Sequence, residues 1–220
     1  IGRTAEDMLG KPLAEFLTAR VLHELRNAVA RLGNPDAVEK LFACEIVDGA
    51  TFDIGLHISG QNIVIEAEPG FAAPNDAGSA VRSMVARLDR TRDLASFCRE
   101  GARQVRALLG YDRVMVYRFA EDGSGEVVAE ACKSGIGSFK GLHYPASDIP
   151  QQARILYKRN LLRIITDVNS TPVRIVPELD ENGRPIDLSL SMLRFVSSIH
   201  IEYLRNMGVA ASLSISIVVD

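Results

Sequence analysis

The chain has 220 residues, of which 47% are apolar and 24% are charged, and its formal net charge at pH 7 is −3. This length suits one large domain or two small ones, and the composition is typical of a globular protein with its own core. The near-neutral charge gives no electrostatic reason to expect a nucleic acid or a membrane as partner, and no apolar run approaches the ~18 residues that span a bilayer.

The first part of the chain is predicted as one helix followed by three strands. Apolar residues recur at helical spacing from Leu13 to Leu32, and Gly33-Asn34-Pro35 ends this helix. The turn-rich segment 70–79 is predicted as a linker and a domain boundary. The strands between them are predicted in residues 40–47, 52–58 and 62–69.

The middle of the chain combines helices with a hairpin. One apolar helical face covers residues 81–88, and a longer one begins after Thr91 or Asp93 as cap and ends at Gly110. Cys98 lies on the longer face and is expected in the core. The hairpin strands are predicted in residues 113–119 and 126–131.

The last part alternates helices and strands around a long irregular stretch, residues 170–191. Pro150 suits the first turn of a helix, for which Ser147 or Asp148 would be the cap. The other elements are a helix to Asn160, a strand over 162–168, a short helix capped by Ser197 or Ser198 and closed by Gly208, and a strand over 210–219. Together the elements predict an α+β fold in two domains.

The cysteines and histidines show no metal or disulfide pattern. Three scattered cysteines without CxxC spacing favour a reducing compartment, so we expect a cytoplasmic protein. The histidines also lack metal-ligand spacing, and we expect no structural zinc. These residues are Cys44, Cys98 and Cys132, and His23, His57, His143 and His200.

Two sets of side chains suggest a site for an anionic ligand. Arg163 and Arg194 would suit carboxylates, which guanidinium groups bind in bidentate geometry, although each taken alone is as well explained by a surface salt bridge. The second set is a stripe of serines on the last strand, which is either a solvent face or a row of hydroxyl donors. The stripe consists of Ser212, Ser214 and Ser216.

A histidine and several aromatic residues would complete such a site. His200 and Tyr203 are three residues apart on a predicted helix and therefore neighbours, although a lone histidine is more often structural. Asp148 lies among apolar and aromatic residues, near Tyr144 and Tyr157, and needs donors there. Carboxylate clamps, hydroxyls, aromatic walls and a central acceptor together suit a flat conjugated molecule with acidic arms.

Four stretches make the resemblance to a known family specific. From about Gly110 to Val219 the chain resembles the GAF domain of bacteriophytochromes, red/far-red photoreceptors that bind a linear tetrapyrrole. The first part, to about Pro69, is similar to the PAS domain that precedes it. The stretches are "RVMVYRFAEDGSGEVVAEA", "HYPASDIPQQAR", "LYKRNLLRIITDV" and "LSMLRFVSSIHIEYLRNMGVAASLSISIVV".

The resemblance implies a role for each site residue. Asp148 of the "PASDIP" motif would face the inner pyrrole nitrogens with its carbonyl and link the pocket to the output region, and His200 would share the pyrrole water network. Ile149 and Pro150 belong to the same motif, and Ile149 would pack on the ring plane. The other implied positions are Arg163, Arg194 and Tyr157 for one propionate, Ser212 and Ser214 for the other, Tyr117, Tyr144 and Tyr203 around the isomerising D ring, and Phe139 and Ser197 elsewhere in the pocket.

The resemblance also implies the cofactor and how it is attached. Plant and cyanobacterial phytochromes have a cysteine at the position of Ile199, so the bacterial type is implied, with biliverdin attached to a cysteine upstream of residue 1. Cys44, Cys98 and Cys132 do not match that cysteine. The chain is expected to stop before the final GAF strand, with the PHY and output domains beyond Asp220.

The expected architecture is a PAS domain in residues 1–70, a linker and connecting helix in 71–90, and a GAF domain in 91–220. Each domain is expected to be an antiparallel sheet flanked by helices, with Pro172–Ser191 as a lasso that the N-terminal segment threads as a knot. A homodimer is expected through GAF helices such as Thr91–Leu109.

Two other function classes remain as alternatives. A GAF domain that senses a small molecule, such as a cyclic nucleotide, would share the fold but would give no red absorption band with biliverdin. An enzyme is not expected from this part of the chain, because the sequence shows no nucleophile–base pair, glycine-rich phosphate loop or metal cluster. The resemblance implies that a histidine kinase follows in the complete protein.

Overall fold

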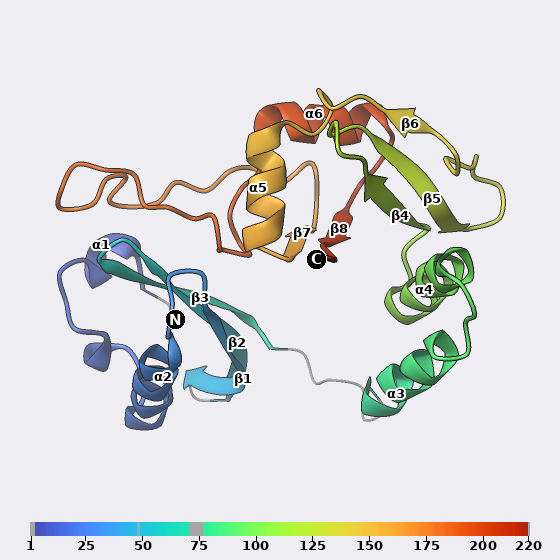
Figure 1. Cartoon of the computed structure of the whole chain (residues 1–220). Coiled ribbons are helices and arrows are strands. Elements are labelled where there is room, and N and C mark those ends of the chain that lie inside the picture. The colour runs from blue at the N-terminus through green and yellow to red at the C-terminus, as the bar shows by residue number, and fades with distance from the viewer. Residues whose placement is uncertain (1–2, 48, 71–76, 220) are drawn as a thin grey trace. The chain divides into compact units, whose positions relative to one another are not determined.

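The computed structural model of the chain describes residues 3–47, 49–70 and 77–219 (Figure 1). Contacts divide the chain into two compact units. Unit 1 joins Ile1–Ala72 to Leu156–Asp220, and unit 2 is Ala73–Ile155. Every strand pairing among the described residues is antiparallel, as expected for an α+β fold.

The first part of unit 1 is a three-stranded sheet with helices before it. The sheet has the order β1-β2-β3, so strands that follow each other along the chain are also neighbours in the sheet. The segment 71–76 of the predicted linker lies outside the described residues. The elements are α1 (Ala5–Met8), a short 3-10 helix (Leu13–Glu15), α2 (Ala19–Arg31), β1 (Val38–Val47), β2 (Ala50–Ser59) and β3 (Asn62–Pro69).

The single helix predicted from Leu13 is divided in two. Pro12 precedes the 3-10 helix, and the regular helix α2 starts only after Thr18, whose hydroxyl accepts a hydrogen bond from the Val21 N–H at 3.3 Å. A threonine cap of this kind satisfies one of the free N–H groups at a helix start. The apolar period continues through the break, so periodicity alone did not reveal the cap.

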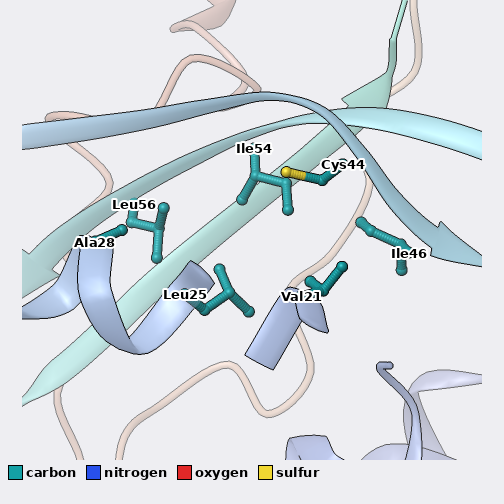
Figure 2. Packing of buried hydrophobic residues seen from close by; sticks show 7 residues of the cluster. All are labelled: Val21, Leu25, Ala28, Cys44, Ile46, Ile54 and Leu56. Carbon is teal, nitrogen blue, oxygen red and sulfur yellow. The ribbon is translucent and has the colours of Figure 1, made fainter. Parts of the chain in front are cut away.

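Helix α2 packs on one face of this sheet (Figure 2). The helical repeat places three apolar residues of α2 against the sheet, and alternation along β1 and β2 places four buried sheet residues on the face that meets them. Leu56 is fully buried and Cys44 is 4% exposed. Burial raises the pKa of the Cys44 thiol, which favours the unreactive protonated form. The buried cluster is Val21, Leu25, Ala28, Cys44, Ile46, Ile54 and Leu56.

His57 is buried on the other face of this sheet. Strand alternation turns it to the face opposite to Leu56, where it is 1% exposed. Neither ring nitrogen of His57 has a hydrogen-bond partner among the described residues. Burial lowers the pKa of His57, while the negative charges of Glu66 and Asp187 act in the opposite direction. The pKa of His57 therefore lies below its usual value, and the imidazole is neutral in the folded chain at pH 7.

The second part of unit 1 contains the last two strands and a helix. Strands β7 (Leu162–Ile165) and β8 (Ser212–Ile215) pair with each other. Helix α6 (Ser198–Asn206) buries Ile201 and Leu204 against Val168. The strand predicted to reach residue 219 ends at Ile215, and Ile217 and Val219 are 78% and 85% exposed.

Unit 2 consists of helices and a hairpin with a third short strand. The cap predictions are confirmed, because Asp93 caps the N-terminus of α4 and Gly110 closes it in the left-handed conformation. Cys98 is only half-buried, and Ala102 is the buried residue of this helix, so the expected core position of Cys98 is not confirmed. The elements are α3 (Ala77–Leu88), α4 (Leu94–Leu109), β4 (Arg113–Phe119), β5 (Gly125–Cys132), β6 (His143–Tyr144) and the start of α5 (Gln151–Arg159).

Truncation of Leu56 tests the core under α2. Leu56→Ala should lower the free energy of unfolding by about 2–5 kcal/mol, because it removes buried methyl groups and leaves a cavity. Chemical denaturation measures this change. Ile63→Ala on β3 is the control, since Ile63 is 47% exposed, and should cost less than about 1 kcal/mol. Equal losses in both variants would contradict the assigned core.

The neutral state of His57 predicts a dependence of stability on pH. As pH falls below about 6.5, the unfolded chain binds a proton at this residue before the folded chain does, so the free energy of unfolding should decrease. His57→Leu should make the decrease between about pH 7.5 and 5.5 smaller, measured by urea denaturation. His23→Leu, at an exposed position, is the control. An unchanged pH dependence in His57→Leu would contradict the assignment.

Candidate ligand-binding site

Arg163 is held by three neighbours in unit 1. It lies on β7 opposite Ser214. Its Nη1 donates to the Asn160 carbonyl at 2.6 Å and to Ser216 Oγ at 2.9 Å. Its guanidinium carbon lies 3.8 Å from the centre of the Tyr157 ring. These neighbours orient the group by neutral dipoles and a cation–π contact, and none of them carries a negative charge.

Arg194 is the second half-buried guanidinium of unit 1. Burial lowers the pKa of Arg194 and of Arg163, and the positive charge of Arg194 lowers the pKa of Arg163 further. Among the described residues, neither arginine forms an ion pair with a carboxylate. The negative charges of Asp187 and Glu66 act in the opposite direction on the pKa of Arg194, without forming an ion pair with it. A bound anion would supply the ion-paired partner that both half-buried cations lack.

The start of helix α6 carries the predicted histidine. Ser197 caps this helix, because its hydroxyl accepts a hydrogen bond from the His200 N–H at 3.3 Å. The His200 and Tyr203 rings are stacked with centroids 6.5 Å apart, as their helical spacing predicts. Burial lowers the pKa of His200, and the charge of Arg163 adds to this effect. His200 is therefore neutral at pH 7 and offers one donor and one acceptor.

The three serines of the stripe lie at and just beyond the last strand, where Ser214 is paired with Arg163. Ser212 is half-buried, Ser214 is exposed, and both lie on β8. The serine that directly contacts a guanidinium is Ser216, just beyond the strand. The stripe contained Ser216 in the sequence, but nothing in the alternation pattern indicated which of the three serines would reach Arg163.

Aromatic residues of unit 2 gather on the hairpin. The Tyr117 ring lies 5.0 Å from the Phe119 ring and 5.9 Å from the Tyr144 ring, measured between centroids. Gly125 on β5 makes this packing possible, since a Cβ there would come within 2.2 Å of the Tyr117 ring. Tyr117 and Tyr144 are therefore neighbours within unit 2.

Phe139 is positioned by an acidic residue that the sequence did not single out. Glu130 accepts a hydrogen bond from the Phe139 N–H at 3.1 Å and forms an ion pair with Arg113 at 3.3 Å. The Arg113 guanidinium carbon in turn lies 3.5 Å from the Phe139 ring centre. Alternation on β5 could have suggested an inward-facing glutamate, but its partners lie in a loop and could not be predicted.

The "PASDIP" stretch forms a turn before α5. Asp148 is exposed, and its N–H donates to the Pro145 carbonyl at 3.1 Å. The Pro150 carbonyl accepts the first helical bonds, from Ala153 at 2.9 Å and Arg154 at 3.1 Å. The sequence predicted Pro150 in the first turn of the helix, whereas in the structure Pro150 directly precedes the helix. No backbone N–H of the described residues donates to the Asp148 carbonyl, which leaves this acceptor open to a ligand.

The part of the chain that the structure describes contains no group of three or more histidine, cysteine, aspartate or glutamate side chains arranged to hold a metal ion. None of its helices is both long and apolar enough to cross a membrane.

Family models match nearly the whole chain. The GAF domain model matches residues 93–220 and the PAS fold model matches residues 1–70. Cyanobacterial phytochrome B of Nostoc sp. is 38% identical over 227 residues, covering 99% of this chain and 30% of the relative. A bacteriophytochrome of Pseudomonas aeruginosa is 53% identical over 137 residues, covering 62% of this chain and 19% of the relative. The chain thus spans at most 30% of the length of these two relatives.

Solved structures of similar proteins agree with these matches. Bacteriophytochrome RpBphP3 from R. palustris is 41% identical with a TM-score of 0.87, over 98% of this chain and 44% of that one. The chromophore-binding domain of Stigmatella aurantiaca phytochrome P1 is also 41% identical, with a TM-score of 0.83, over 99% of this chain and 73% of that one. The family suggested by the sequence motifs and the α+β fold are both confirmed: the chain belongs to the GAF domain family, as the PAS–GAF pair of a bacteriophytochrome.

Proposed function

We propose that this chain binds a linear tetrapyrrole, biliverdin, and serves as the light-sensing part of a red/far-red photoreceptor. The observation that carries the proposal is the pair of half-buried arginines, Arg163 and Arg194, neither of which forms an ion pair with a carboxylate among the described residues. A ligand with carboxylate arms would supply that ion-paired partner. The similarity to phytochromes supports the same choice of ligand.

The carboxylate arms would be held by unit 1. Arg163 is already oriented by Ser216 and the Tyr157 ring, so little side-chain freedom would be lost when a carboxylate binds. Arg194 would complete the clamp on one propionate, and Ser212 and Ser214 would donate hydroxyls to the other. Charge-assisted hydrogen bonds of this kind each contribute roughly 1.5–3 kcal/mol.

The centre of the ligand would meet neutral polar groups. His200 is neutral at pH 7 and can both donate and accept, and the open Asp148 carbonyl is an acceptor for pyrrole N–H groups. When bound, the tetrapyrrole absorbs red light and isomerises at its bridge to ring D. Tyr117, Tyr144 and Tyr203 are proposed to surround that ring, with Phe139, Ile149 and Ser197 at further pocket positions.

The remaining parts of the proposal concern the complete protein. Asp148 would pass the change in the pocket to a PHY domain, and a histidine kinase would be the output.

We further propose a cytoplasmic homodimer that pairs through GAF helices. Leu94 and Phe97 on α4 are 69% and 42% exposed, which supports an apolar contact there. The similarity to phytochromes favours the photoreceptor function over that of a cyclic-nucleotide sensor.

Removal of Arg194 tests the carboxylate clamp. Arg194→Ala should weaken biliverdin binding about tenfold or more, because a charge-assisted bond to the propionate is lost. Titration of the protein with biliverdin, followed by the red absorption band, measures the affinity. Arg174→Ala is the matched control, because Arg174 is exposed on the irregular stretch 170–191 and its removal should leave binding unchanged. Equal affinities of the wild type and Arg194→Ala would rule out the clamp.

Replacement of Asp148 separates ligand binding from signal transfer. In protein that includes the PHY domain, Asp148→His should retain biliverdin and its red band but suppress photoconversion, since the proposed link to the output region is lost. Difference spectra before and after red light measure photoconversion. Asp89→His, at an exposed position on the segment after α3, is the control. Full photoconversion in Asp148→His would remove Asp148 from this role.

A further inference from the structure

Glu66 makes an unusual contact within unit 1. It is half-buried on β3, where it pairs with Gly55 of β2. Its Oε2 accepts a hydrogen bond from the Met192 N–H at 3.0 Å, and its Oε1 accepts one from the Leu193 N–H at 2.7 Å. One carboxylate thus binds two consecutive backbone N–H groups that are more than a hundred residues away along the chain.

The contact fixes the backbone directly before Arg194. On the other side of Arg194, Ser197 is held as the cap of α6 by its hydrogen bond with the His200 N–H. Only Phe195 and Val196 separate Arg194 from this cap. The position of the Arg194 backbone is therefore set from both sides, by Glu66 and by the start of the helix.

The same carboxylate affects the arginine without pairing with it, because its negative charge acts to raise the pKa of Arg194. Both Glu66 oxygens accept backbone N–H groups, and no ion pair joins Glu66 to Arg194 among the described residues. A charge-assisted bond to an N–H group fixes the backbone and leaves the guanidinium available for an external anion. A second contact also holds Met192, because Lys40 Nζ lies 3.4 Å from Met192 Sδ.

We propose that Glu66, in the PAS part, is a positioning residue for Arg194 and helps determine how tightly the chain holds the carboxylate of its ligand. The inference rests on the proposed function, because it assigns Arg194 to a propionate. Groups that hold a binding residue in its productive geometry commonly matter nearly as much as the binding residue itself. Glu66 would thus tune affinity without touching the ligand.

A comparison of two pigments tests the proposal. Biliverdin carries free propionates, whereas biliverdin dimethyl ester has the same conjugated rings with both carboxylates capped. Glu66→Gln keeps one oxygen acceptor but places an amide donor against the second N–H, so it should disturb the backbone before Arg194. We expect it to bind biliverdin about tenfold more weakly than the wild type, and to bind the dimethyl ester within about twofold of the wild type.

Glu68→Gln is the matched control. Glu68 lies two residues along the same strand on the same face, is exposed, and makes no hydrogen bond to the 192–193 backbone. Glu68→Gln removes the same charge and should leave the affinities for biliverdin and for its dimethyl ester unchanged. Absorption titrations of the whole chain with each pigment, together with a thermal unfolding curve for each variant, give all the required measurements.

The outcomes separate this inference from the proposed function. A selective loss of biliverdin affinity in Glu66→Gln, absent in Glu68→Gln, supports the positioning role. An equal loss for both pigments, or no loss, would overturn that role while the wild type still binds biliverdin. A wild-type chain that binds neither pigment would overturn the proposed function, and the inference with it.

Discussion

The positive charge shared by Arg163 and Arg194 is the constraint on which the site depends. Removing two like charges from water is unfavourable. Among the described residues, a carbonyl, a hydroxyl and an aromatic ring surround Arg163, and the negative charges of Asp187 and Glu66 act on Arg194. Neither arginine forms an ion pair with a carboxylate of these residues, which supports the proposed binding of an anion. His200 responds to the charge of Arg163, because the cation disfavours a proton on the imidazole.

The groups around this charge are placed by contacts of very different range. Ser197 caps the first turn of its own helix, whereas Ser216 reaches Arg163 across a strand pair. Glu66 reaches the Met192 and Leu193 backbone from another sheet. The hairpin of unit 2 follows the same logic, since Glu130 holds the loop that carries Phe139. Local caps define where helices begin, and the half-buried carboxylates of Glu66 and Glu130 hold irregular segments between the elements.

The sequence was most informative where structure depends on near neighbours. The strand from Arg113 to Phe119, the cap at Asp93 and the left-handed Gly110 follow from alternation and capping chemistry, and all three are present as predicted. The break at Thr18 was missed because apolar spacing persists across it. The role of Glu66 could not be predicted at all, since its partners are backbone groups whose approach depends on the whole fold.

Gly125 shows how the absence of a side chain can determine the packing of a neighbouring aromatic ring. The Tyr117 ring occupies the volume that any larger residue at this point of the hairpin would fill. Even a single methyl group would push the phenol away from Tyr144 or force the two strands apart. The orientation of a ring proposed to border the pigment is thus encoded one strand away, so changes in colour or light response can arise from a residue that never meets the pigment.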